Sequence, residues 1–430
     1  MSDTPTPPPD ERFHALDCLR GCAMLLGVVL HAGVSFATMP VPFWAVHDAH
    51  PNALVDVALF AVHDFRMQLF FVLAGFFGCL LYRRYGIAGT ARHRLLRVGV
   101  PFVLSVVLIV PTIMGAFLWA ELDTVRTRGL EPGAPAPRAF AAQQLAAHPD
   151  AGNAEIVWEQ FASGRFIALL QLAHLWFLYY LLIYTAVFLA LAPLARALEG
   201  STAVARFDSA FRWLCESRAR LAVLPVLTFL LLLSMQSPVV DTPLRWIPER
   251  HLLAYYALFF AFGWALYRHR DLVPAFGAGW RTNLVVAHLV VLPLALVALG
   301  GWVEATKTDE AVVPVWRALG FATQAVYTWL LIAGLWGAFG HYFARPRAWV
   351  RYLADSAYWC YLASITPVVV LQFVVKDWPL PGPLKWALVS TVAMGLLLLS
   401  YEYLVRYTFI GAILNGRKIR PAAQRAPVSG

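Results

Sequence analysis

Long runs of apolar residues, separated by shorter polar segments, are the dominant pattern along this chain. A membrane-spanning helix needs about 20 predominantly apolar residues, and ten stretches approach that length. We therefore predict an all-α polytopic membrane protein with about ten transmembrane helices. The predicted spans are 16–38, 58–82, 98–119, 171–194, 220–236, 251–267, 283–301, 318–340, 350–374 and 385–408.

Composition supports a membrane protein and excludes one function class. The chain has 430 residues, of which 60% are hydrophobic and 14% are charged, whereas a soluble domain averages about 45–50% apolar and about 25% charged residues. The formal net charge of +9 would by itself fit a nucleic-acid binder. A soluble nucleic-acid-binding protein is excluded because the apolar residues form membrane-length blocks.

The basic residues predict the orientation in the membrane. They gather in alternate connecting segments, the first of which reads RRYGIAGTARHRLLR and contains no acidic residue. By the positive-inside rule these segments and both termini are cytoplasmic. The predicted domains are a disordered Pro-rich tail (1–15), a membrane domain (16–410) with a loop on the outer face (120–164), and a basic cytoplasmic tail (411–430). The loop is either a mobile lid or a linker.

The first predicted span contains three ionisable residues. In the run LDCLRGCAMLLGVVLH these are Asp17, Arg20 and His31. An Asp or Arg at the centre of a membrane helix costs roughly 2.5–3.5 kcal/mol, so such residues are functional candidates by default. Arg20 and His31 lie within roughly 20° of one helix face and roughly 16 Å apart along the axis. Asp17 and Arg20 have the (i, i+3) spacing of an ion pair.

Two further spans place ionisable residues near the predicted outer face. The second span begins FAVHDFRMQLFF, with His63, Asp64 and Arg66, and the fourth begins QLAHLWFL, with His174. Together with His31, these residues converge on one depth from three helices. The cytoplasmic end carries a second charged group, made of Asp17, Arg20, Arg94, Arg97 and the Glu402/Arg406 pair. For His63 and His174, an interfacial or capping role is the alternative.

His31 is the strongest candidate for catalysis. A neutral imidazole is the usual general base for taking the proton of a hydroxyl group. No cluster of residues with metal-ligand spacing accompanies it, so we expect neither a metal site nor a tightly bound cofactor.

The motifs together resemble the membrane-bound acyltransferase-3 family. The resemblance rests on LDCLRGCAMLLGVVLH, MQLFFVLAGFF, RLLRVGVP and HLWFL, which occur in this order. Within the family, HDFRMQLFFVLAGFF and SYEYLVRY are most similar to members that succinylate osmoregulated periplasmic glucans. The resemblance implies a multi-pass protein of the bacterial inner membrane, with the loop 120–164 on the periplasmic side. It also implies a cytoplasmic acyl-CoA donor, succinyl-CoA or acetyl-CoA, and an acceptor hydroxyl on a periplasmic glucan or another envelope carbohydrate. Membrane lipid and proteins of glucan synthesis are the other expected partners.

The resemblance also assigns residues. The family motifs fall on Arg20 and His31, on Phe70, Phe71 and Gly75, on Arg94 and Arg97, and on His174 and Trp176. One position departs from the pattern: relatives commonly have a His where the segment YLASITP has Ser364. Either that His is dispensable, or the acceptor or the chemistry differs in this protein.

Acyl transfer requires a base and a stabiliser of the oxyanion. His31 is the predicted base, Asp64 is a candidate to orient it, and Arg66 or a neighbouring His is a candidate to hold the oxyanion or an anionic acyl group. Arg94 and Arg97 are the predicted ligands of the coenzyme A phosphates. Transfer through a covalent acyl-His intermediate and direct transfer are both open.

Two rival functions explain the residues less well. In a secondary transporter the intramembrane ionisable groups would form a proton relay, but inverted repeats with broken helices are not evident in the sequence. A purely structural membrane subunit leaves the Asp17–Arg20–His31 stripe unexplained.

Overall fold

In the computed structural model, residues 13–39, 41, 43–416 and 418 are described, and they form helices without any strand. The fold class expected from the apolar runs is thus confirmed for this part of the chain. The chain divides into two compact units, which are treated separately. Unit 1 comprises residues 13–23, 63–99 and 177–354, and unit 2 comprises the described residues of 24–62, 100–176 and 355–418. The helices that contribute residues to both units are α1 (His14–Gly33), α2 (Ala53–Arg94), α7 (Trp176–Ala197) and α15 (Ala348–Ala363).

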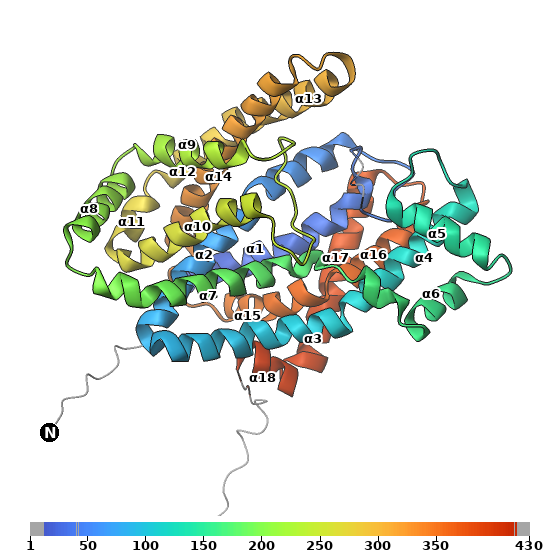
Figure 1. The fold of residues 1–430 in the computed structure, drawn as a ribbon, viewed down its shortest axis with the longest axis horizontal. Coiled ribbons are helices and arrows are strands. Elements are labelled where there is room, and N and C mark those ends of the chain that lie inside the picture. The colour runs from blue at the N-terminus through green and yellow to red at the C-terminus, as the bar shows by residue number, and fades with distance from the viewer. Residues whose placement is uncertain (1–12, 40, 42, 417, 419–430) are drawn as a thin grey trace, which may run out of the picture. The chain divides into compact units, whose positions relative to one another are not determined.

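The remaining elements of unit 1 include the long helix α14. Helices α9, α12 and α13 pack along it, and Figure 1 shows α13 and α14 running side by side. These elements are η2 (Leu95–Gly99), α8 (Thr202–Glu216), α9 (Arg220–Leu232), α10 (Arg250–Arg268), η5 (Arg270–Leu272), α11 (Val273–Phe276), α12 (Trp280–Val286), η6 (Ala287–Val291), α13 (Leu292–Thr308) and α14 (Val313–Tyr342).

Unit 2 has its own apolar core, to which the end of α1, helix α4, the bent pair α15–α16 and α17 contribute buried side chains. Helix α16 packs against both α4 and α17. The remaining elements are η1 (Val34–Phe36), α3 (Val100–Leu108), α4 (Val110–Arg128), α5 (Ala136–Ala147), α6 (Asn153–Ala162), η3 (Arg165–Leu169), η4 (Ala173–Leu175), α16 (Ile365–Val375), α17 (Gly382–Ser400), η7 (Tyr401–Val405) and α18 (Phe409–Asn415).

Six helical segments of the described chain are long and apolar enough to cross a membrane, or seven if the bent pair α15–α16 counts as one span. Each of the ten predicted runs lies mainly in helical segments. The second and third runs lie in the helical stretch Ala53–Arg128, which a kink at Gly86 interrupts, and the fifth run overlaps α9, which has only 13 residues. The chain is therefore a multi-pass membrane protein, and the count of ten and the cytoplasmic position of the termini stay predictions.

The basic segment after the second predicted span is helical on both sides of a sharp kink. Gly86 interrupts α2 with φ of 66°, a left-handed conformation that glycine adopts without steric cost. The hydrogen bond from the Arg94 side chain to the carbonyl of Ala74 shows that the chain reverses direction there. Arg83 and Arg84 are exposed just before this turn.

A close helix crossing explains the Gly of the aromatic–Gly motif. A Cβ on Gly75 of α2 would lie 2.0 Å from the carbonyl oxygen of Phe260, and one on Gly263 of α10 would lie 1.9 Å from that of Val72. Small residues permit such close approach of membrane helices. Beside the crossing, the buried ring of Phe71 packs against aromatic side chains of α7 and α10.

Helices α15 and α16 meet at a bend of 68°. Ser364 lies at the break and its hydroxyl donates to the carbonyl of Tyr361 at 3.2 Å. Pro367 follows in the first turn of α16, and it has no N–H to donate to the residue four positions earlier. The position at which this chain departs from the family motif is therefore the break between two helices.

The segment 120–164 is folded and packed. It begins inside α4, which ends before Gly129, a residue with φ of 79°. The segment then forms α5 and α6, whose buried side chains Ala141 and Ile156 pack against Leu122 of α4. Its periplasmic location stays a prediction. The Pro-rich N-terminal tail lies largely outside the described residues, and the described part of the C-terminal tail includes α18.

Candidate functional site

His31 lies in the last turn of α1, in unit 2, and is half-buried. The indole of Trp44 lies nearly parallel to its imidazole ring, with 6.0 Å between ring centroids and 19° between planes. Trp44 is itself fixed, because its Nε1 donates to Ser35 Oγ at 3.1 Å and to Gln372 Oε1 at 3.0 Å. The indole of Trp44 is therefore held in a fixed position beside the imidazole of the proposed base.

Gln372 of α16 is a component of this site that sequence reasoning missed. It is fully buried, and its Nε2 donates to the carbonyls of His31 at 2.9 Å and Ala32 at 3.0 Å. The same amide thus holds the backbone of His31 and, through its oxygen, the indole of Trp44. A polar residue in the otherwise apolar run ITPVVVLQFVV was the available signal.

A buried ion pair anchors the loop that carries Trp44. The Lys385 ammonium, on α17, donates to both carboxylate oxygens of Asp48 at 3.0 and 2.7 Å and to the carbonyl of Lys376 at 3.1 Å. Both side chains of the pair are completely buried. Each of the three N–H groups of the ammonium thus has an acceptor, which a buried charge requires. The next residue of α17, Trp386, donates a hydrogen bond from its Nε1 to the carbonyl of Val29 in α1 at 2.8 Å.

His174 is bound to the bend between α15 and α16. It is buried, and its Nε2 donates to the carbonyl of Leu362 at 3.1 Å. The Tyr361 hydroxyl in turn donates to the backbone carbonyl of His174 at 2.6 Å. Because the carbonyl of Leu362 can only accept, Nε2 is the ring nitrogen of His174 that carries the proton. His31 and His174 are therefore both held by the bent helix pair, at different points along it.

Asp17 and Arg20 form the predicted ion pair on α1, with 3.2 Å between Oδ1 and Nη2. The guanidinium also lies 5.2 Å from the centroid of the Phe77 ring. Their side chains are 38% and 43% exposed, so this pair is only partly buried. The ion pair confirms the (i, i+3) spacing, and the functional role of the two residues stays a prediction.

His63, Asp64 and Arg66 follow one another near the start of the part of α2 that belongs to unit 1. His63 Nε2 donates to the carbonyl of Val240 at 3.3 Å, and Arg66 is buried. Asp64 has no exposed surface, and both of its carboxyl oxygens lack a hydrogen-bond partner within the described chain. A buried polar group without such a partner is costly to retain, which keeps Asp64 a functional candidate.

Arg94 and Arg97 lie beyond the Gly86 turn and are half-buried. Arg94 Nη2 donates to the carbonyl of Ala74 at 3.4 Å, and Arg97 belongs to the π-helical turn η2. The basic segment is thus folded back along α2, with the Arg94 guanidinium at the level of Ala74.

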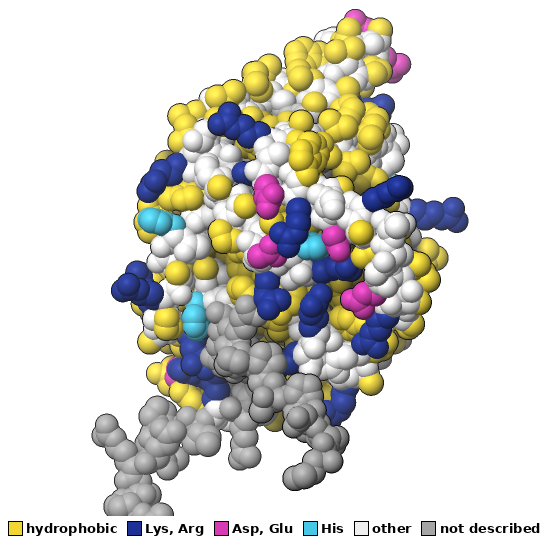
Figure 2. Space-filling view, turned by 90° about the vertical axis from the view of Figure 1, so that its left-hand side faces the viewer, with side chains coloured by type: hydrophobic (Ala, Val, Ile, Leu, Met, Phe, Trp, Pro, Cys, Tyr) yellow, Lys and Arg dark blue, Asp and Glu magenta, His cyan; other side chains and the backbone are white. Residues whose placement is uncertain are grey.

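Basic residues of the later connecting segments, which contribute to the predicted orientation in the membrane, also form ion pairs between elements of unit 1. Arg212 of α8 pairs with Asp271 of η5 at 2.6 Å, and Asp208 of α8 accepts bonds from Arg268 and His269, each at 3.0 Å. Figure 2, which views the side where α8 and α11 lie, shows acidic side chains among the many basic ones. The Arg212 guanidinium lowers the pKa of the Asp271 carboxyl, chiefly through their hydrogen bond.

The predicted site residues are thus divided between the units. His31 and His174 belong to unit 2, whereas the others, Asp17, Arg20, His63, Asp64, Arg66, Arg94 and Arg97, belong to unit 1. Their catalytic and donor-binding roles stay predictions.

Comparisons with known proteins bear on the class of this site. The acyltransferase-3 family model, described as an acyltransferase domain, matches residues 13–402. Among curated proteins, the chain is similar to the glucans biosynthesis protein C of Escherichia coli strains SMS-3-5, O1:K1 and O157:H7 EC4115, with 33% identity over 103 residues in each case. The match covers 24% of this chain and 26%, about a quarter, of each relative. No solved structure matches the chain significantly.

Proposed function

The chain belongs to the acyltransferase-3 family, and we propose that it moves an acyl group from cytoplasmic acyl-CoA to a hydroxyl of a periplasmic glucan or another envelope carbohydrate. The observation that carries the proposal is the fixed position of His31. Its ring lies beside Trp44, and its backbone carbonyl accepts from Gln372. A base must be held in place relative to the hydroxyl that it deprotonates.

The proposed chemistry is one exchange of bonds at a thioester carbonyl. The imidazole of His31 takes the proton of the acceptor hydroxyl as the hydroxyl oxygen attacks. The new ester bond forms, the bond to sulfur breaks, and coenzyme A leaves as a thiol after taking up a proton. A covalent acyl-His intermediate divides the same exchange into two steps and is the alternative route.

We assign the donor to the end of α2 that carries Arg94 and Arg97. Guanidinium groups bind phosphate oxygens in a bidentate manner, and coenzyme A carries several phosphates. The positive-inside rule puts this basic turn on the cytoplasmic side, where acyl-CoA is made. Succinyl is the favoured acyl group because of the motif resemblance.

The acceptor is proposed from the relatives. The similar proteins of Escherichia coli are named for glucan biosynthesis, which supports a glucan as the first acceptor to test. The matched quarter of their length leaves the acceptor of this chain to experiment.

The test is mass spectrometry of periplasmic glucans from cells that carry the wild-type protein, the His31→Ala variant or neither. We expect an O-acyl mass increment with the wild type alone, and its size identifies the acyl group. Immunoblots of the membrane fraction control for the amount of each protein. Near-wild-type acylation by His31→Ala would refute the base assignment.

The rival is a proton-coupled transporter of an envelope precursor, since intramembrane ionisable residues also serve as proton relays. It is tested with purified protein in liposomes, loaded with acyl-CoA and given external carbohydrate. The acyltransferase forms an ester in the absence of a proton gradient, whereas a transporter moves solute without forming one.

A further inference from the structure

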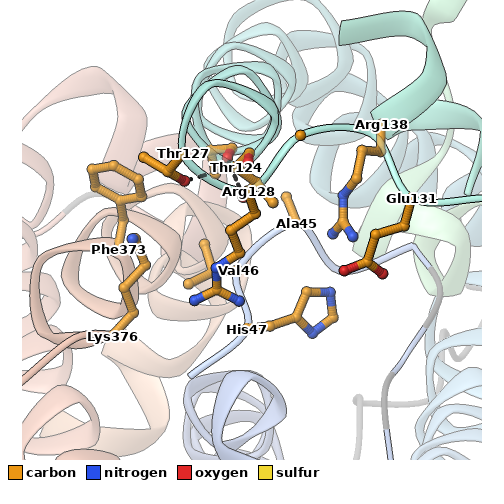
Figure 3. Close-up of a pocket in the computed structure, with 12 residues that line it drawn as sticks. Ala45, Val46, His47, Thr124, Thr127, Arg128, Glu131, Arg138, Phe373 and Lys376 are labelled. Atoms are coloured by element: carbon orange, nitrogen blue, oxygen red, sulfur yellow. Dashed lines mark hydrogen bonds between the residues drawn. The ribbon is translucent and has the colours of Figure 1, made fainter. Parts of the chain in front are cut away.

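Unit 2 contains a cavity of about 320 Å³ that none of the roles above uses. Four segments line it: the loop residues 45–47 that follow Trp44, the end of α4 with the chain just after it, the start of α5 with Arg138, and the end of α16. In Figure 3 the side chains of His47, Arg128, Glu131 and Arg138 surround one open space, and Lys376 and Phe373 lie on the far side of Arg128. The cavity is at the small end of the about 300–1,000 Å³ range of small-molecule sites.

Its lining combines hydrogen-bond donors and acceptors. Arg128, Arg138 and Lys376 supply N–H groups, and Glu131 supplies a carboxylate. His47 contributes a neutral imidazole at neutral pH, because burial first, and then the nearby charges of Arg138 and Arg128, lower the pKa of this residue. A neutral imidazole is both a donor and an acceptor.

The positive charges of the cavity are largely balanced by the protein itself. Arg138 donates from Nε to Glu121 Oε2 at 2.8 Å, and Glu121 is almost fully buried. The Lys376 ammonium lies 2.6 Å from a carboxylate oxygen of Asp377 and 3.5 Å from one of Asp123. An anionic ligand would have to compete with these carboxylates, and an apolar ligand would cover the polar groups of the lining without offering them hydrogen bonds. A neutral ligand with many hydroxyl groups neither competes with the carboxylates nor leaves the polar lining without hydrogen bonds, because each hydroxyl can donate and accept.

Two of the segments that line the cavity also hold His31. Ala45 follows Trp44, whose indole stacks on the imidazole, and Phe373 follows Gln372, whose amide binds the carbonyl of His31. Lys376 also lines the cavity, and its backbone carbonyl accepts a hydrogen bond from the buried Lys385 ammonium, which binds Asp48 in the loop that carries Trp44. A ligand in the cavity thus contacts the two segments that set the position of the base.

We propose that this cavity is the acceptor subsite, and that it binds about one or two sugar units of a neutral carbohydrate chain, as its volume allows. The proposal rests on the proposed function only in naming the bound carbohydrate as the acceptor. Arg128 and Glu131 hydrogen-bond sugar hydroxyls, while the rest of the carbohydrate extends into solvent on the face formed by the α4–α5 connection.

The experiment measures binding and transfer with the same full-length protein in nanodiscs. The probes are cellotetraose, laminaritetraose and sophorotetraose, whose binding is measured by isothermal titration calorimetry, and succinyl-CoA is the donor in transfer assays. Arg128→Ala removes a lining donor, and Thr127→Trp fills the cavity. Arg165→Ala is the matched control, because Arg165 is exposed in the same unit, pairs with Glu159 and does not line the cavity. Thermal unfolding shows whether each variant is folded.

We expect both cavity variants to weaken tetrasaccharide binding at least tenfold and to raise the KM for the acceptor, with the KM for succinyl-CoA unchanged and Arg165→Ala like the wild type. Transfer by the wild type with unchanged acceptor KM in folded cavity variants overturns the acceptor subsite and leaves the proposed function intact. Binding that the cavity variants abolish, without any transfer by the wild type, supports the carbohydrate site and overturns the acyltransferase. Neither binding nor transfer of any probe by the wild type overturns the cavity proposal.

Discussion

At the scale of single residues, the site depends on polar side chains that lie far apart in the sequence. Gln372 binds the backbone of His31 and the indole of Trp44, and Lys385 neutralises Asp48 in the interior. Each is a buried polar group with matched partners, an arrangement that specifies one geometry when it is complete. The orientation of the proposed base is therefore set by residues that need not touch a substrate.

Replacing Gln372 by Leu tests this positioning role. The change removes the donor to the carbonyls of His31 and Ala32 and the acceptor for Trp44, with similar side-chain size. Because a hydrogen bond contributes about 1 kcal/mol, we expect kcat for acyl transfer to fall about fivefold with an unchanged KM for acyl-CoA. Val370→Ala, at an exposed position of the same helix, is the control. Equal loss in both variants would argue against positioning by Gln372.

The Asp48–Lys385 pair leads to a prediction about stability. Lys385→Met leaves the Asp48 carboxylate buried without its counter-charge, a change that costs about 3–5 kcal/mol when one partner of a buried pair is removed. We expect a clearly lower Tm in detergent for Lys385→Met. The double variant Asp48→Asn with Lys385→Met should regain part of the loss, because no buried charge is then left over. A double variant less stable than the single one would contradict this account.

At the scale of elements, helix breaks and close crossings shape each unit. Gly86 reverses the chain within α2, and the bend at Ser364 lies beside Tyr361 and Leu362, both of which hydrogen-bond to His174. The crossing of α2 and α10 needs glycine on both helices. The aromatic–Gly motif of the family resemblance therefore has a packing role in this chain.

Gly75→Ala tests the crossing. The added methyl group would lie 2.0 Å from the carbonyl oxygen of Phe260, so the backbones must move apart. Overpacking of this kind typically costs about 1–3 kcal/mol, and we expect a lower Tm and less folded protein after purification. Gly78→Ala is the control on the same helix, since its nearest neighbouring atom would be at an ordinary 3.4 Å. The same Tm for both variants would show that the crossing adapts.

At the scale of the whole molecule, the family match over residues 13–402 confirms the resemblance drawn from the motifs. The multi-pass character agrees with the long apolar helices. The proposed function adds a direction, with the donor on the cytoplasmic side and the acceptor on the periplasmic side. That direction depends on the predicted topology, which the following experiment measures.

Single cysteines at exposed positions report the topology. Asp150→Cys lies in the turn before α6, and Glu199→Cys lies in the basic segment after α7. In cells with a permeabilised outer membrane, a membrane-impermeant maleimide should label Asp150→Cys, whereas Glu199→Cys should react only after lysis. The unmodified protein, four of whose five cysteines are buried, gives the background. The reverse pattern would invert the orientation and move the donor site to the other face.

The sequence by itself determined the helical membrane class, because about 20 apolar residues in a row are stable chiefly as a membrane-spanning helix. It also determined the ion pairs Asp17–Arg20 and Glu402–Arg406, since spacings of three and four residues bring side chains together on any helix. Only the tertiary structure decided what surrounds His31. Trp44 and Gln372 are 328 positions apart, and a hydrogen bond over that distance forms only when the loop that carries Trp44 packs against helix α16.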